Sequence, residues 1–104
     1  MNWTSTENDR LIQAIFAIKT PDEARRFLRD LMTEKEITEF ANRLQTAELL
    51  SENVSYSAIG LKTGLSSTTV ARVSKWLNGK AGGYRTIINR LHHHNPIQIR
   101  RGLS

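Results

Sequence analysis

Residues 55–78 read SYSAIGLKTGLSSTTVARVSKWLN, and the rest of the chain is best understood from this stretch. Ser55 is a residue type that caps helix N-termini, so it predicts a helix from Tyr56 to Thr63. Gly64 follows directly and supplies the left-handed residue that commonly ends such a helix. The stretch therefore begins with one short helix that stops at a glycine.

A second helix is predicted after Ser66 or Ser67, either of which can cap it. Its apolar residues recur at helical spacing, namely Val70, Val73 and Leu77. Gly60 lies inside the first helix, where glycine costs about 1 kcal/mol against alanine, so we interpret it as making room for a helix crossing at a steep angle. Two short helices with a tight turn are typical of a helix-turn-helix; the alternative is a helical hairpin without a ligand.

The composition limits the classes of protein to consider. A chain of 104 residues is long enough for one domain but small for a core of its own, which favours a compact helical fold or a dimer. It has no cysteine, which excludes disulfides and thiolate metal sites. It has no apolar run of about 20 residues and no secretory signal pattern. We therefore expect a cytoplasmic protein.

Charge is distributed unevenly along the chain, whose formal net charge is +5. All ten acidic residues lie at or before Glu52, together with seven of the cations. Eight lysines and arginines and no carboxylate follow Asn53. A positive half that contains the helix-turn-helix predicts binding to a polyanion.

Four further helices are predicted from caps and apolar periodicity. The first begins after Ser5 or Thr6, and the last runs over residues 84–94. The second and third begin with the capping pairs Thr20–Glu23 and Thr33–Glu36, and the second has a proline at its first position. Asn53 ends the third helix in left-handed geometry. The expected apolar faces are Leu11, Ile12, Ile15 and Phe16; Phe27, Leu28 and Leu31; Ile37, Phe40, Ala41, Leu44, Ala47 and Leu50; and Tyr84, Ile87, Ile88 and Leu91.

The sequence thus predicts an all-α protein of six short helices in a single domain, 1–104. Residues 1–53 are expected to form a dimerisation core, 55–78 the helix-turn-helix, 84–94 a last core helix and 95–104 a basic tail. The helices before Ser55 are too short to bury their apolar stripes alone. Packing against a second copy is the simplest remedy, because symmetric dimers are the commonest soluble oligomers.

The segment from Arg26 to Leu91 resembles the tryptophan-repressor-like family of bacteria, in particular its less characterised branch. The resemblance is carried by FLRDLMTEKEITEFANRLQTAELL, SYSAIGLKTGLSSTTVARVSKWLN and GGYRTIINRL, in this order and spacing. It implies an all-helical, intertwined homodimer with two helix-turn-helix heads on a shared core. It also implies a transcriptional regulator, a repressor, that docks a recognition helix in the major groove of DNA.

Site residues follow from the resemblance and from side-chain chemistry. Residues implied to face the bases are Ser66, Ser67, Thr68 and Thr69, and residues implied to meet the DNA backbone are Ser55, Tyr56 and Ser57. Arg72 matches an arginine that contacts both ligand and phosphate, and its guanidinium also suits bidentate contact with guanine O6 and N7. Lys62 and Lys75 are cations suited to phosphate. The four consecutive hydroxyl residues are small and let a helix N-terminus approach a phosphate or base edge, although capping alone needs only one of them.

An effector pocket is implied at Arg43 and Arg72, which match arginines that the family uses for its indole ligand. The sequence departs from the tryptophan-binding members at Val73, where they have glycine, and at bulky Trp76. Both side chains would crowd the pocket. A small-molecule co-repressor is therefore left open, and tryptophan itself is not expected.

Other readings are weaker. Consecutive histidines on a helix, His92, His93 and His94, point in different directions and do not converge on a metal ion, so no metal site is predicted; a pH-sensitive helix end is favoured instead. No catalytic constellation is present, and we do not expect an enzyme. Arg100 and Arg101 suit either a minor-groove arm or a solvated end. The alternative functions are an RNA- or ribosome-associated adaptor and a helical protein-interaction module.

Overall fold

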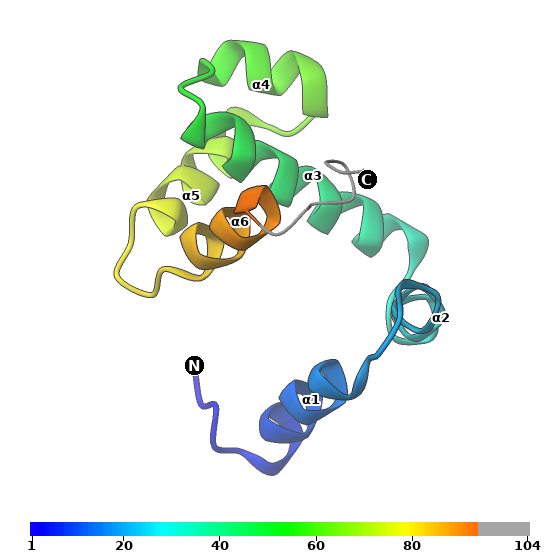
Figure 1. The fold of residues 1–104 in the computed structure, drawn as a ribbon. Coiled ribbons are helices and arrows are strands. Elements are labelled where there is room, and N and C mark those ends of the chain that lie inside the picture. The colour runs from blue at the N-terminus through cyan, green and yellow to red at the C-terminus, as the bar shows by residue number, and fades with distance from the viewer. Residues whose placement is uncertain (94–104) are drawn as a thin grey trace. The chain divides into compact units, whose positions relative to one another are not determined.

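The structure, a computed structural model, describes residues 1–93. It contains six helices and, in this part of the chain, no strand: α1 Thr6–Ala17, α2 Pro21–Leu31, α3 Glu34–Ser51, α4 Tyr56–Thr63, α5 Ser67–Leu77 and α6 Gly83–His93 (Figure 1). This confirms the predicted all-α, six-helix fold. None of the helices up to His93 combines the length and apolar character that crossing a bilayer requires.

Contacts divide the chain into two units, Met1–Thr38 and a second one that begins at Glu39. The division falls inside α3, which is a continuous helix through both. Each unit is described by itself below, and the organisation of the whole chain as one domain stays a prediction.

Helix α1 starts at the cap that the sequence offers. The Oγ atom of Ser5 accepts a hydrogen bond from the backbone N–H of Asn8 at 3.2 Å, which decides between Ser5 and Thr6. In α2 the Oγ1 atom of Thr20 accepts from the N–H of Glu23, as predicted. The carboxylate of Glu23 differs from the prediction, because it accepts from the N–H of Lys19 at 2.9 Å and not from that of Thr20. The glutamate side chain is long enough to reach one residue further back along the entering chain.

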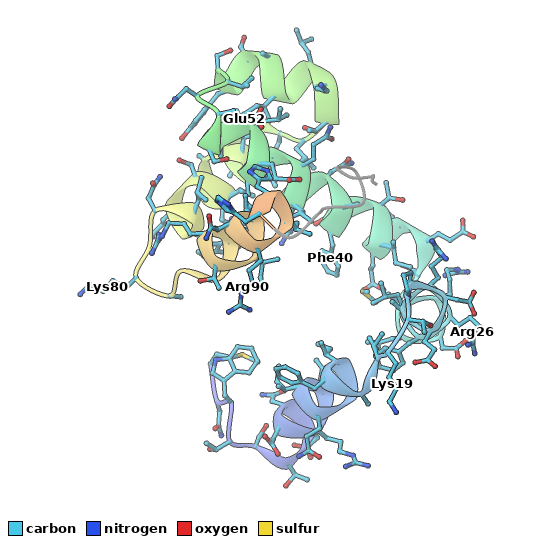
Figure 2. The ribbon with its side chains drawn as sticks, viewed as in Figure 1. Lys19, Arg26, Phe40, Glu52, Lys80 and Arg90 are labelled. Carbon is cyan, nitrogen blue, oxygen red and sulfur yellow. The ribbon has the colours of Figure 1, made fainter. Side chains whose placement is uncertain are left out.

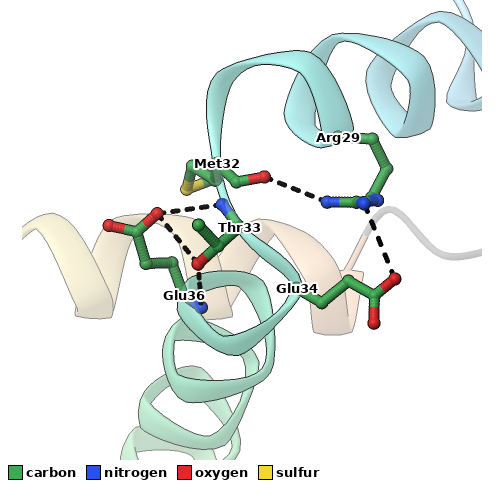
Figure 3. Close-up of polar contacts among 5 residues, drawn as sticks. All are labelled: Arg29, Met32, Thr33, Glu34 and Glu36. Atoms are coloured by element: carbon green, nitrogen blue, oxygen red, sulfur yellow. Dashed lines mark hydrogen bonds and ion pairs between the residues drawn. The ribbon is translucent and has the colours of Figure 1, made fainter.

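Helix α3 starts with a complete capping box (Figure 3). The N–H of Thr33 donates to Oε1 of Glu36 at 2.9 Å, and the N–H of Glu36 donates to Oγ1 of Thr33 at 3.1 Å. These bonds stabilise the ionised carboxylate, so the pKa of Glu36 lies below its ordinary value, mainly through the backbone N–H of Thr33. The preceding helix end is also tied down, because the guanidinium of Arg29 donates to the carbonyl of Met32 at 3.1 Å.

The first unit buries none of its residues. The predicted buried face of α2 is not closed within this unit, since Phe27 and Leu28 are half-buried and Leu31 is exposed. The side chain of Phe16 in α1 is 84% exposed. Two short helices have no second layer of their own against which to close an apolar face.

The second unit has a small apolar core. Ala47 of α3, Val73 and Leu77 of α5 and Ile88 of α6 are buried together, with Leu44, Leu50 and Tyr84 packed against them. The one buried polar residue in the described chain, Thr46, donates its hydroxyl to the carbonyl of Asn42 at 2.8 Å. Asn53 has φ 65°, which confirms the predicted left-handed end of α3.

Candidate nucleic-acid interface

Helix α4 begins and ends at the residues predicted from the sequence. The Oγ atom of Ser55 accepts from the N–H of Ala58 at 3.2 Å, and Gly64 at the other end has φ 74°. The N–H of Gly64 donates to the carbonyl of Gly60 at 2.9 Å. Ile59, in the middle of the helix, is fully buried. The first helix of the pair is thus capped, terminated and anchored as predicted.

The reason that we gave for Gly60 is not supported. A Cβ atom at this position would meet only the carbonyl oxygen of Leu65, at 3.7 Å, which is ordinary van der Waals contact. An alanine would therefore fit here. Gly64 needs glycine for a different reason, namely its positive φ.

Helix α5 is capped by Ser66 and not by Ser67. The Oγ atom of Ser66 accepts from the N–H of Thr69 at 3.2 Å and lies 3.1 Å from the Oγ1 atom of Thr69. Two of the four predicted base-facing hydroxyls are therefore engaged with each other. Ser67 and Thr68 are exposed and make no side-chain hydrogen bond to the described part of the chain, so their hydroxyls are available to a ligand.

The outward face of α5 is formed by Thr68, Ala71, Arg72 and Lys75, which are all exposed and lie at i, i+3, i+4 and i+7. We call these four residues the α5 face. The opposite side of the helix carries the buried residues Val70, Val73 and Leu77. Neither cation of the α5 face pairs with a carboxylate among residues 1–93. Sequence reasoning missed Ala71, although the same helical spacing that identifies the buried side would have identified it.

The residues predicted on α4 lie at the surface. Ser55, Tyr56, Ser57 and Lys62 are exposed, although the hydroxyl of Ser55 is used by the cap. Lys62 makes no ion pair with the described residues. The second unit therefore presents cations on both helices of the helix-turn-helix, and its carboxylates up to His93 all lie on or beside α3, at Glu39, Glu48 and Glu52.

The four residues predicted for an effector pocket lie in different environments. Arg43 pairs with Glu39 at 2.6 Å and stacks over the ring of Phe40 at 5.6 Å. Arg72 is exposed on the α5 face, whereas Val73 is fully buried in the core. None of these three lines the apolar cavity of about 710 Å³ that includes half-exposed Trp76. The effector pocket stays a prediction.

This apolar cavity lies between the end of α5 and the start of α6. Its walls are formed by Leu44, Lys75, Trp76, Gly79, Lys80, Ala81, Gly83, Tyr84 and Ile87. Burial raises the pKa of Tyr84, and the cationic Arg43 opposes this in part. Lys80 extends away from the α5–α6 connection, whereas Phe40 projects from α3 (Figure 2).

The end of α6 is linked to α3 through a histidine. His92 Nε2 lies 3.5 Å from Glu48 Oε2, a contact that becomes an ion pair when the imidazole is protonated. His92 and His93 are exposed at the end of α6. His94 and the basic tail with Arg100 and Arg101 lie outside the described residues.

Comparisons with known proteins agree with this architecture. Residues 6–92 match the family described as Trp repressor protein. The Bacillus subtilis (strain 168) protein described as "Uncharacterized protein YerC" is 36% identical over 85 residues, which cover 82% of each chain. The crystal structure of a TrpR like protein from Eubacterium eligens ATCC 27750 superposes with a TM-score of 0.80 at 36% identity, over 86% of this chain and 93% of that one.

Proposed function

Because the chain belongs to the Trp repressor family, a regulatory DNA-binding family, we propose that it is a sequence-specific transcriptional repressor. The observation that carries the proposal is the α5 face. A hydroxyl, a methyl, a guanidinium and an ammonium line one exposed side of a helix whose other side is locked into the core. A rigid helix with such a face is what readout in a major groove requires.

The chemistry of the α5 face assigns a role to each group. The guanidinium of Arg72 reaches guanine O6 and N7, or a phosphate, through two parallel hydrogen bonds. Lys75, one turn further along, serves as a point charge for phosphate. The free hydroxyls of Ser67 and Thr68 lie at the helix N-terminus and bind bases or bridging water. Ser57 and Lys62 on α4 contact the backbone beside the groove.

The charge distribution supports a DNA partner. No carboxylate follows Glu52 in the sequence, so phosphates meet no repulsion from the helix-turn-helix itself. Cations on both α4 and α5 are without carboxylate partners in the described chain, and counterion release upon binding gives affinity that falls steeply with salt.

The working unit is a homodimer. Helices α1 and α2 carry apolar side chains for which the first unit offers no cover, among them Ile15, Phe16 and Leu31. A second copy supplies the missing surface and pairs two helix-turn-helix heads. The half-sites then lie about one helical turn apart in an imperfect palindrome, and occupancy of a promoter represses it sterically.

The test is a binding measurement on duplexes selected from a random library. Arg72→Ala is expected to weaken binding to the selected duplex by roughly 1–3 kcal/mol while the circular dichroism spectrum is unchanged. Arg90→Ala removes one positive charge from an exposed position of α6 and is the matched control. It is expected to weaken binding to the selected duplex less. Equal affinity of the wild-type protein for selected and random duplexes would contradict the proposal. Tighter binding to structured RNA than to DNA would favour the RNA-associated alternative.

A further inference from the structure

One hydrogen bond joins α6 to the end of α5. The guanidinium of Arg85 donates through Nη1 to the carbonyl oxygen of Leu77 at 2.6 Å, across eight positions of sequence. In the part of the chain that the structure describes, every other side-chain hydrogen bond spans six positions or fewer and stays within a helix or its flanking turn. The contact is therefore the one side-chain hydrogen bond between two helices among residues 1–93.

The carbonyl of Leu77 lacks a backbone partner in the described chain. Helix α5 ends at Leu77 and its C-cap Asn78 has φ −93°, so no left-handed residue follows directly to close its last carbonyls. The backbone N–H groups of Asn78 and Gly79 are used by the carbonyls of Ser74 and Trp76. Arg85 supplies what the helix end lacks, a donor and a positive charge at the negative end of the dipole.

A glycine in the α5–α6 connection lies against this guanidinium. Gly82 is buried and has φ 70°, and a Cβ atom there would lie 3.2 Å from Nη2 of Arg85. The next residue, Gly83, has nothing within 4 Å of the corresponding position. The two neighbouring glycines therefore differ in two respects: Gly82 has a positive φ and lies against the guanidinium of Arg85, whereas Gly83 has neither feature.

We propose that Arg85 is a positioning residue for DNA recognition, which fixes the direction of the α5 face relative to α6. This rests on the proposed function. Leu77 and Ile88 hold the two helices together through apolar contact, which is non-directional. The directional bond to the Leu77 carbonyl sets the angle of α5 and so the placement of Arg72 and Lys75, which lie five and two residues before that end of the helix.

Loss of the Arg85 hydrogen bond is expected to reduce sequence specificity more than the overall affinity for DNA. Hydrogen bonds to base edges demand accurate placement of a side chain, whereas contacts to phosphates tolerate a tilt of the helix. Loss of the Arg85 bond is thus expected to weaken binding to a selected duplex while binding to random DNA changes little beyond the effect of one lost charge.

The experiment compares Arg85→Met with Arg90→Met. Each removes one cation from an exposed position of α6, but Arg90, labelled in Figure 2, makes no ion pair or hydrogen bond to the described residues. Dissociation constants are measured for the selected duplex and for a random duplex of equal length at one salt concentration. Arg85→Met is expected to lower the ratio of the two affinities about tenfold, the scale of one lost hydrogen bond. Arg90→Met is expected to weaken both alike and leave the ratio unchanged.

Arg85→Lys keeps the charge and a donor and is expected to recover most of the ratio. Gly82→Ala is not used as a variant, because the φ of 70° at this position strains any residue other than glycine whatever happens to Arg85. A ratio that is unchanged in Arg85→Met would overturn the role of Arg85 while the proposed function stands. A wild-type ratio of one would overturn both. If Arg85→Met does not fold, the polar variant Arg85→Gln decides the question: a lowered ratio supports the role of Arg85, and an unchanged ratio overturns it.

Discussion

Both units have helices with side-chain caps, but they bury very different numbers of residues. Ser5, Thr20 and Thr33 each accept a backbone N–H at a helix start, as Ser55 and Ser66 do in the second unit. Yet the first unit contains no buried residue, whereas the second has a core and two fully buried β-branched side chains on α5. Caps define where a helix begins without providing anything for its apolar side to touch.

The difference in burial predicts where the helices of each unit obtain their stabilising contacts. Isolated helices of 11 or 12 residues, the lengths of α2 and α1, are marginal in water, because their stability in proteins comes mostly from packing. The helix-turn-helix has such packing within its own chain. In the proposed homodimer a second copy supplies the packing that the first unit lacks, so we expect the interface to involve α1 and α2.

The largest effect is expected in the core of the second unit. Ile59→Ala removes a fully buried side chain from α4 and is expected to lower the free energy of unfolding by about 2–5 kcal/mol. Leu61→Ala, on the same helix at a side chain that is 90% exposed, is the control and is expected to change it by less than about 0.5 kcal/mol. Urea denaturation measures both. Similar losses for the two variants would mean that the outer side of α4 is also covered.

A smaller effect is expected in the first unit, and it should depend on protein concentration. Phe16→Ser removes an exposed aromatic ring from α1 and is expected to weaken dimerisation by about 1.5–3 kcal/mol, the value of burying one large apolar side chain. Sedimentation equilibrium measures the dissociation constant. Gln13→Ala, at an exposed polar position of the same helix, is the control and should leave it unchanged. A wild-type protein that is monomeric at micromolar concentration would remove this explanation for the exposed apolar side chains.

Sequence reasoning succeeded where the cause lies within four residues. The caps at Ser55 and Thr33, the left-handed residues Asn53 and Gly64, and the buried side of α5 all depend on local geometry or helical period. Sequence reasoning failed where the feature depends on the distance between residues far apart in the chain. The interpretation that Gly60 makes room for a helix crossing is not supported, because a Cβ atom would fit there and spacing along the chain does not give the distance between helices.

Other features could be found only in three dimensions. Arg85 carried no signal beyond its charge, yet it bonds a carbonyl eight residues away. Periodicity identifies the apolar stripe of α2 but does not tell that it is only partly buried in this chain, since a period shows which residues share a face and not what covers that face. For the candidate site, the exposed positions on α4 and α5 agree with expectation, and their contacts to DNA remain predictions.

The smallest effect on stability is expected at the start of α3, where a helix cap contributes and a buried side chain does not. Glu36 is exposed in the capping box of α3, so its contribution comes from hydrogen bonds alone. Its pKa is lowered in the folded protein, which means that its stabilisation is fully present above the pKa of the unfolded state and is lost as the pH falls through the lower, folded value.

We expect a small loss of stability of the wild-type protein across the acid range, measured by thermal unfolding between pH 6 and pH 3. Glu36→Gln keeps an acceptor but cannot ionise, so this part of the pH dependence should vanish. Asp30→Asn provides the control, because it also replaces an exposed carboxylate by an amide but at a side chain without a hydrogen bond or ion pair to the described residues. An identical profile for wild type and Glu36→Gln would show that the start of α3 is held by packing, which would place it with the second unit in this comparison and not with the first.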